Sequence, residues 1–287
     1  MDMNVSSVTL PEDLSGLSSQ DLMRLEKQIA DRFMGGLPWG SISWGLGNLA
    51  VWLSLWPLTL SGILPLWIAF PIATLNVMLS YLPSHEAQHR IIAQEGDKLF
   101  WLNELVGHLS TIPLVVPYDV ARLTHLEHHK HTNDPELDPD IGTKAKGPWH
   151  SILNSIRNRQ PGSKASASYG ATLQRLGTPA AQRAGLIALA WTGHAVVAAL
   201  IWWLPRHIAQ TYIQFYLSWA PHHPGTETGR YRNTRSFRSL VGNIGSMGMQ
   251  FHIIHHLYPR IPLMRTPAAY WALKPVLEAR GCRLDGL

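Results

Sequence analysis

The chain has 287 residues, of which 46% are hydrophobic and only 15% are charged. Soluble domains carry about 25% charged residues, so this composition argues against an ordinary soluble protein and favours contact with lipid. The formal net charge is +5, but the basic residues are scattered without a recognition motif, so we expect no nucleic-acid partner. The single cysteine, Cys282, excludes a disulfide framework and a cysteine-based metal site, which leaves nitrogen and oxygen as metal ligands.

The first forty residues are polar and lack the charged-then-apolar pattern of a signal peptide. We therefore expect a cytosolic N-terminal leader over residues 1–40 and a membrane domain over residues 41–287. Within the leader, Ser18 stands three residues before Asp21, which predicts the start of a short helix through the segment DLMRLEKQIADRF. The charges of this helix are mixed, and we expect them to be exposed.

Two long apolar regions follow. Residues 41–82 contain no charged residue and are about twice as long as the ~20 apolar residues that cross a bilayer, with a turn expected near Pro57 and Ser61-Gly62. A second region, residues 184–221, is interrupted by Arg206, where we expect the second turn. The predicted fold class is an all-α integral membrane protein, with four transmembrane helices in two hairpins and a cytosolic, histidine-rich cap.

The distribution of Lys and Arg predicts the orientation. Residues 1–40, 86–184 and 221–287 hold 3, 11 and 9 of the 24, and the only other one is Arg206. Such asymmetry marks the cytoplasmic side, so both termini and the histidine-rich helix ends are expected in the cytoplasm, at a bacterial inner membrane. Residues 99–117 are apolar but carry Glu104 and two prolines, so we expect them to lie at the membrane interface or to re-enter rather than to span.

Histidines gather at four places that end or follow these apolar regions: HEAQH (85–89), HLEHHKH (125–131), APHHPG (220–225) and HIIHH (252–256). Histidines at i, i+3 and i+4 lie on one face of a helix, so each group can direct its imidazoles at a common point. The first group matches the zinc-protease pattern H-E-x-x-H, in which Glu86 would activate water. One zinc needs three or four ligands and would leave further clusters without a role. Two iron ions would use them all, because imidazole suits iron and iron chemistry activates dioxygen.

The combined spacing H-x3-H, H-x2-H-H and H-x2-H-H, with an isolated histidine after the fourth apolar segment, resembles the membrane fatty acid desaturase superfamily, which includes bacterial carotenoid hydroxylases and ketolases. The segments HTNDPELDPD, PHHPGTETGRYRNTRS and HHLYPRIPLMRTP agree with it, and the last two are more similar to the carotenoid-modifying branch. The resemblance covers roughly Ser41 to Pro267. It implies four transmembrane helices under a cytosolic domain that holds two non-haem irons.

Carried over residue by residue, the resemblance implies that the metal ligands are His85, His89, His125, His128, His129, His222, His252, His255 and His256. His223 is the alternative to His222, which we favour because it directly follows the proline that ends the fourth apolar segment. Metal-bound imidazoles usually donate their second N–H to a carboxylate or carbonyl, and the carboxylates expected in this role are Asp134 and either Asp138 or Asp140.

The remaining histidines have plainer expectations. His131 points to a different helix face from His129, so it is expected at the surface or in support of a ligand, with direct metal ligation as the alternative. His108 and His194 are expected in the core, and His150 and His207 at the surface.

The expected function is an O2-dependent di-iron oxidoreductase that desaturates or hydroxylates an unactivated C–H bond of a long-chain lipid, with a fatty acyl chain as substrate. The alternatives are a carotenoid ring hydroxylase or ketolase and, more distantly, an intramembrane zinc metalloprotease. The lipid is expected to enter from the bilayer along the first hairpin. No cysteine-ligated cluster or flavin motif is present, so electrons are expected from a separate ferredoxin, rubredoxin or haem protein, docked by Arg230 and Arg232. The lipid-lining residues expected on that hairpin are Trp44, Trp52, Trp56, Leu75 and Met78.

Overall fold

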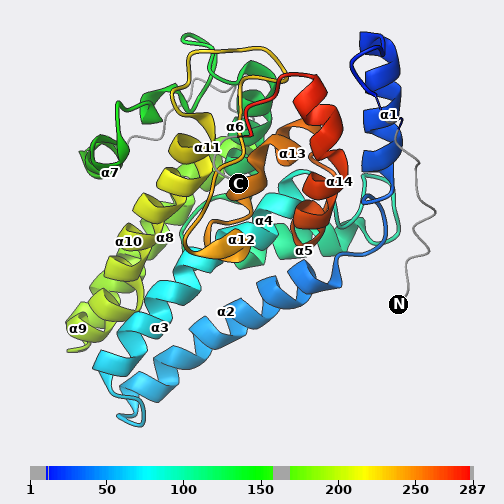
Figure 1. The fold of residues 1–287 in the computed structure, drawn as a ribbon. Helices are drawn as coiled ribbons and strands as arrows, with labels where there is room; N and C mark the ends of the chain where they lie inside the picture. Colours follow the sequence, from blue (N-terminus) through cyan, green and yellow to red (C-terminus); the bar gives the residue numbers. More distant parts are fainter. Residues whose placement is uncertain (1–10, 12, 158–168, 285–287) are drawn as a thin grey trace.

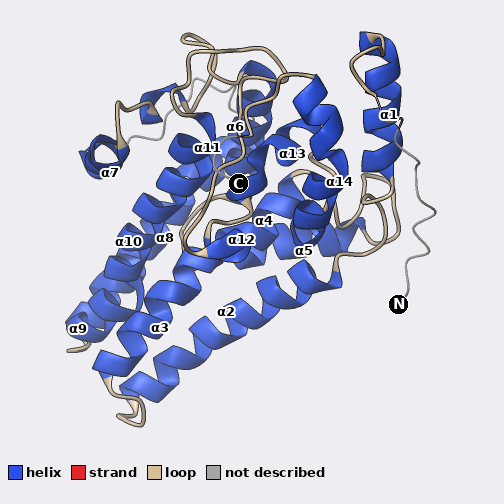
Figure 2. Cartoon of the chain, in the orientation of Figure 1, coloured by secondary structure: helices blue, strands red, loops and turns tan. Residues whose placement is uncertain are grey.

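A computed structural model describes residues 11, 13–157 and 169–284, and every regular element in this part of the chain is a helix (Figure 2). The prediction of an all-α protein is confirmed. The α-helices are α1 (Ser19–Asp31), α2 (Trp39–Leu60), α3 (Leu66–Leu79), α4 (Tyr81–Gln88), α5 (Phe100–Ser110), α6 (Tyr118–His131), α7 (Pro148–Arg157), α8 (Tyr169–Trp191), α9 (Ala195–Ala198), α10 (Leu204–Ile213), α11 (Ala220–His222), α12 (Gly242–Gly245), α13 (His252–Leu257) and α14 (Thr266–Ala279). Short 3₁₀ turns are η1 (Ile141–Thr143), η4 (Met249–Phe251) and η5 (Leu263–Arg265), and π-helical segments are η2 (Ala199–Trp203) and η3 (Gln214–Trp219).

Helices α2 and α3 form the first predicted hairpin. The helix continues through Pro57, and the turn lies at residues 61–65, where Gly62 adopts a left-handed backbone with φ of 76°. Two asparagines join the helices: Asn48 Nδ2 donates to the carbonyl of Asn76, and Asn76 Nδ2 donates back to Asn48, each at 2.8 Å. Because these hydrogen bonds join two otherwise apolar helices, they fix the register of the hairpin.

The second hairpin turns at a different place from the one predicted. Helix α8 ends at Trp191, residues 192–194 form the turn, and a continuous helix runs from α9 through η2, α10 and η3 to α11. Arg206 lies inside this helix, where its Nε donates to the carbonyl of Leu114 at 2.9 Å. The charge of Arg206 suggests a turn, but the turn lies at Gly193. Its φ of 85° is a left-handed conformation that glycine adopts readily.

The middle of this long helix is shaped by Pro205. Proline has no N–H, so the carbonyl four residues earlier, that of Ile201, loses its helical partner. Trp52 Nε1 of α2 donates to this carbonyl instead, at 3.3 Å. Trp52, Trp56 and Trp202 also meet edge to face, with ring centroids 5.6 to 6.1 Å apart. The two hairpins are thus packed into one bundle (Figure 1).

Four long helices in two hairpins are present, but one continuous apolar stretch, residues 66–88, has the length and composition to cross a membrane within the described chain. The second hairpin is less apolar because α8 carries Arg183 and α10 carries Arg206. The lining expected along the first hairpin is wrong for Leu75, whose side chain is 57% exposed on the outside of the bundle.

Residues 99–117 do not form a span. Their first part is the short helix α5. The loop that follows packs against the continuous helix over residues 195–222, called the long fourth helix below, where Trp202 Nε1 donates to the carbonyl of Pro113 at 3.1 Å. Leu114 in this loop is fully buried. The expected position of residues 99–117 at the membrane interface, or as a re-entrant segment, stays a prediction.

Most charges of the N-terminal helix α1 are exposed, as expected, but one face of the helix is buried and takes Glu26 with it. Leu22, Ile29 and Ala30 pack against α13 and α14, and Glu26 is fully buried. Residues 1–10 and 12 of the predicted leader lie outside the described residues, and its boundary at residue 40 stays a prediction. The cap above the bundle consists of α1, α6, α13 and α14, with α4 continuing from α3 into its base (Figure 1).

Candidate metal centre

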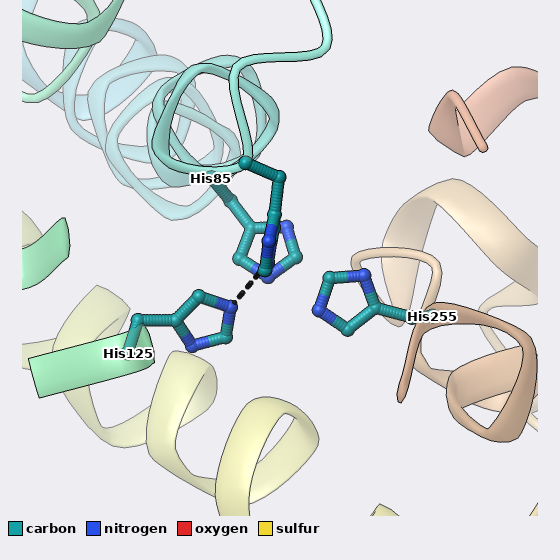
Figure 3. Close-up of side chains that lie close together, drawn as sticks. His85, His125 and His255 are labelled. Atoms are coloured by element: carbon teal, nitrogen blue, oxygen red, sulfur yellow. Dashed lines mark hydrogen bonds between the residues drawn. The ribbon is translucent and has the colours of Figure 1, made fainter. Parts of the chain in front are cut away.

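Three elements that are distant in sequence direct imidazoles at one point. Figure 3 shows His85 of α4, His125 of α6 and His255 of α13 pointing toward one another. With His89, which caps α4, they offer four ligand nitrogens that all lie within 4.8 Å of one another. His89 and His125 approach to 2.8 Å between their Nε2 atoms.

A second group lies beside the first. His128 of α6, His222 at the end of α11, and His252 and His256 of α13 again bring four ligand nitrogens within 4.8 Å of one another. The Nε2 atom of His222 is 3.1 Å from that of His128 and 3.0 Å from that of His252. The histidines of α6 and of α13 are therefore divided between the two groups.

His129 joins the two groups. Its Nε2 lies 3.1 Å from His125 Nε2 and 2.9 Å from His255 Nε2, in the first group. Its ring stacks on that of His256, in the second group, with centroids 4.1 Å apart. All nine histidines expected from the sequence are therefore brought together.

Hydrogen bonds cannot account for these contacts. An imidazole nitrogen carries either one hydrogen or one lone pair, so it makes one such bond. The Nε2 atoms of His125, His129 and His222 each have two nitrogen neighbours within 3.1 Å. Metal–imidazole bonds are about 2.1 Å long, so two ligands at a right angle on one metal lie ~3.0 Å apart. Buried His85 Nε2 and His256 Nε2 have no hydrogen-bond partner at all, which also fits a metal.

The protonation of the cluster suits metal binding. Burial, followed by the neighbouring imidazoles, holds the pKa values of His125, His129 and His255 well below the usual range. The same causes lower the pKa values of His252 and His256. These rings are therefore neutral near pH 7 and keep a lone pair for a metal.

Groups behind the cluster orient two of the rings. His128 Nδ1 donates to Asp138 Oδ1 at 2.8 Å, and His222 Nδ1 donates to the carbonyl of Asn233 at 3.1 Å. Burial lowers the pKa of His128, but the bond to Asp138 and the charges of Asp140 and Asp138 outweigh it, and the net pKa is raised. Each bond at Nδ1 leaves Nε2 free to face the cluster.

The three predicted carboxylates differ in position. Asp138 alone touches an imidazole at hydrogen-bond distance; Asp140 is 4.0 Å from His128 Nδ1 and accepts from Ser218 at 2.9 Å. Asp134 accepts the backbone N–H groups of the turn that follows it. Its expected role at the cluster is therefore wrong.

Residues that the sequence analysis did not single out also shape this region. Asn133 Nδ2 donates to the carbonyls of Glu227 and Asn233 at 2.7 and 2.8 Å, so it holds the segment after His222 against the segment after α6. The sequence N-D-P was a possible signal for this role, because asparagine favours turns and tolerates the left-handed backbone that Asn133 adopts, with φ of 67°.

Several expected histidines lie elsewhere. His223 is only partly buried, its ring packs on Trp219, and His222 takes the place in the cluster. His131 lies outside both groups, 3.6 Å from Glu127. The core positions expected for two histidines are wrong: His108 is exposed on α5 and His194 is partly exposed at the second hairpin turn.

The remaining surface histidines agree in part with expectation. His150 is exposed, as predicted, whereas His207 is partly buried and its Nδ1 lies 2.7 Å from the carbonyl of Trp203.

Glu86 is buried, and its carboxylate accepts the backbone N–H of Leu263. It is not among the atoms that converge with the histidines.

The model of the fatty acid desaturase family matches residues 61–286, most of the chain and all nine histidines. The chain belongs to the fatty acid desaturase family. The prediction of an oxidoreductase enzyme of this membrane superfamily is thereby confirmed.

Individual members of the family are distant relatives. An sn-1 acyl-lipid omega-3 desaturase (ferredoxin) of Nostoc sp. is 26% identical over 74% of this chain and 69% of its own length. An sn-1 oleoyl-lipid 12-desaturase of Synechocystis sp. is 30% identical over 47% of this chain and 36% of its own. A zeaxanthin 4-ketolase of Chlamydomonas reinhardtii is 26% identical over 65% of this chain. This chain covers only 36% of the oleoyl-lipid desaturase and 40% of the ketolase, well under two thirds of their lengths.

Proposed function

We propose that this family member is an O2-dependent di-iron oxidoreductase that desaturates or hydroxylates an unactivated C–H bond of a long-chain lipid, with a fatty acyl chain as its substrate. The observation that carries the proposal is the convergence of nine buried imidazoles, in two groups joined by His129, at one end of an apolar bundle. Imidazole suits iron, and two iron ions would use this many neutral nitrogen donors, whereas one zinc needs only three or four.

Each group would hold one iron ion. The first would use His85, His89, His125, His129 and His255, and the second would use His128, His222, His252 and His256. Bound iron supplies the redox chemistry that activates dioxygen toward a C–H bond. The chain contributes orientation through Asp138 and the Asn233 carbonyl, and its buried surroundings exclude water from the reacting groups.

Desaturation removes two hydrogen atoms from the acyl chain, and O2 leaves as two water molecules after it takes up two further electrons and two protons. The chain has one cysteine and therefore no cysteine-ligated cluster of its own, so a separate protein must deliver the electrons. A ferredoxin is the donor we favour over rubredoxin or a haem protein, because the Nostoc relative is described as a ferredoxin enzyme. Arg230 and Arg232 are candidates for docking the acidic donor.

We further infer that both hairpins lie in the bilayer, as four spans, with their turns on the side opposite the histidines. Neither turn, residues 61–65 or 192–194, contains Lys or Arg. Ile63 and Trp191 at these turns are 73% and 90% exposed, which suits hydrocarbon or the interface better than water. By the positive-inside rule, the histidines and both ends of the chain face the cytoplasm, at a bacterial inner membrane.

The experiment is to purify the protein from an iron-replete host, measure its metals, and analyse the lipids of a host that makes both acyl lipids and carotenoids. We expect about two iron ions per chain and acyl chains that have lost two hydrogen atoms or gained one oxygen atom. Replacement of His128 or His255 by alanine should remove both results. Protein that holds zinc alone, or unchanged lipids with a ferredoxin system present, would contradict the proposal.

A carotenoid ring hydroxylase or ketolase is the second candidate, favoured by the likeness to the zeaxanthin 4-ketolase. It predicts oxygen in the pigment with unchanged acyl chains in the same extract. An intramembrane zinc protease is a poor third candidate, because it needs Glu86 beside the metal, and the carboxylate instead accepts the N–H of Leu263.

A further inference from the structure

An apolar groove of about 460 Å³ runs between α7 and the long fourth helix. This volume is within the range of about 300–1,000 Å³ that is usual for small-ligand sites. The groove lies outside the histidine cluster and is lined by no Lys, Arg, Asp or Glu; its polar lining residues are His207, Thr211 and Tyr212. Its walls include Ile152 and Ile156 of α7, and Leu204, Ile208, Thr211 and Phe215 of the fourth helix.

The inner end of the groove approaches the second histidine group. Phe215 lines the groove, and its ring packs on the ring of Trp219, with centroids 5.1 Å apart. Trp219 in turn lines a small cavity of about 10 Å³ together with His128, His222 and the charged side chains of Asp138, Asp140 and Lys144. Two aromatic rings in contact therefore separate the groove from the cavity beside the cluster.

Both aromatic residues belong to η3, a π-helical segment that ends one turn before His222. Such segments interrupt the regular hydrogen-bond ladder of a helix and occur often at functional sites. Pro221 also lacks the N–H that the carbonyl of Leu217 would accept in a regular helix. The wall between groove and cavity is thus built from a part of the helix that lacks the regular i to i+4 hydrogen bonds.

The outer side of the groove joins the apolar surface of the bundle. Ile208 and Ile156 line the groove and are also 39% and 52% exposed, and Trp203 is exposed nearby on the same long helix. In the proposed orientation this surface faces lipid. An uncharged groove open to hydrocarbon accepts methylene groups, whereas a charged headgroup would lose its hydration there without a partner.

We propose that this groove is where the acyl chain of a bilayer lipid docks before it reacts, with Phe215 and Trp219 as the wall between the groove and the second histidine group. The inference rests on the proposed function for the identity of the substrate. The fourth helix then has two roles, because η3 and α11 carry both this wall and His222.

The test uses vesicles that contain a phospholipid with a diazirine on its acyl chain, and maps the photo-adducts on the purified full-length protein. We expect adducts on α7 and on residues 204–215, in both the iron-loaded and the iron-depleted protein. Labelling needs neither oxygen nor turnover, so its result is independent of whether the protein oxidises lipid.

Ile208→Trp fills the groove from one wall and Ile156→Trp from the other, so a folding defect in one variant does not decide the question. We expect several-fold weaker labelling and a several-fold higher KM for acyl lipid, with iron content unchanged. The matched control is Val196→Trp, an exposed position of the same long helix away from the groove, which should change neither. Absence of adducts in the groove would overturn the proposal. Loss of adducts in both variants with an unchanged KM would also overturn it, because the groove would then hold a lipid that is not the substrate.

Discussion

At the scale of single residues, the carboxylate of Asp138 decides the orientation of one imidazole. It accepts from His128 Nδ1 and also from the backbone N–H groups of Asn133 and Asp140, at 2.7 to 2.8 Å. Burial raises the pKa of Asp138, but its bonds to His128 and the backbone outweigh burial and lower it, so the group is ionised near pH 7. An ionised acceptor at Nδ1 makes Nε2 the nitrogen available to a metal.

Asp138→Asn should therefore weaken iron binding and activity by about 10- to 100-fold, because the amide keeps the size of the side chain but not its charge. Iron per chain and turnover in a reconstituted donor system provide the measurement. Asp134→Asn is the control, since Asp134 bonds only to the turn that contains Glu136 and Leu137, and it should retain both. Equal losses in the two variants would contradict the assigned role.

Glu86 is expected to act by positioning rather than by proton transfer, because it joins α4 to the loop after α13 through the N–H of Leu263. Glu86→Gln keeps an acceptor and should retain most activity and iron. Glu86→Ala leaves a buried N–H unpaired, at a cost of about 1–3 kcal/mol in stability. Thermal unfolding and iron content separate the two. Complete inactivity of a folded, iron-loaded Glu86→Gln protein would favour a chemical role for the carboxylate.

Cys282 should be an unreactive thiol. Burial, and secondarily the charge of Glu26, raise its pKa to about 12, whereas a free thiol ionises near ~8.5. At pH 8 we expect alkylation of the folded protein to be at least about 100-fold slower than after denaturation, and the chain has no second thiol to confuse the reading. Between about pH 8.5 and 12 the unfolded state binds fewer protons, so this residue makes unfolding easier as pH rises. Rapid labelling of native protein at pH 8 would disprove the assignment.

At the scale of elements, the histidine positions depend on how closely short helices pack. Tyr118, at the start of α6, is buried against α5, and its hydroxyl donates to the carbonyl of Ala87 in α4 at 3.0 Å. This close approach needs Gly107, because a Cβ atom there would stand 2.4 Å from the tyrosine ring. Gly107 thus fixes the position of α6, which carries His125, His128 and His129, relative to α4, which carries His85.

Gly107→Ala should lower the stability by about 1–3 kcal/mol through overpacking, and it should reduce iron content by moving α6 away from α4. Gly47→Ala on α2 is the matched control: nothing lies within 4 Å of its added Cβ, and alanine favours the helix by up to about 1 kcal/mol. Fluorescence-detected gel filtration after heating gives the two apparent melting temperatures. A Gly107→Ala protein as stable as the control would contradict the packing argument.

At the scale of the whole molecule, a buried ion pair ties the N-terminal helix to the cap. Arg280 Nε lies 2.9 Å from Glu26 Oε2, with the two side chains 6% and 0% exposed. Glu26 also accepts from Tyr258 at 2.8 Å and from Tyr231 at 3.2 Å. Tyr258 follows His256 by two residues, so α1 supports α13, which carries His252, His255 and His256.

Glu26→Ala should destabilise the protein by about 3–5 kcal/mol, because it leaves the arginine buried without its partner. The double replacement Glu26→Leu with Arg280→Met should recover most of that loss. Arg24→Ala removes an exposed pair with Asp21 and should change stability by no more than about 1 kcal/mol. Thermal melting and protease cleavage at α1 measure these effects; an unchanged Glu26→Ala protein would show that α1 is not held by this pair.

The sequence by itself determined the helical class and the first hairpin, because each depends on local signals such as the length of an apolar run. The i, i+3, i+4 spacing placed histidines on shared helix faces, and the set of nine followed from the resemblance to the desaturase superfamily. Only the tertiary structure decided how the nine divide, since His128 meets His222 across 94 positions of sequence. The selection of His222 over His223 and of Asp138 over Asp140, and the burial of Glu26, also depend on contacts between distant segments. Spacing within a helix shows which side chains share a face, but it carries no information on what packs against that face.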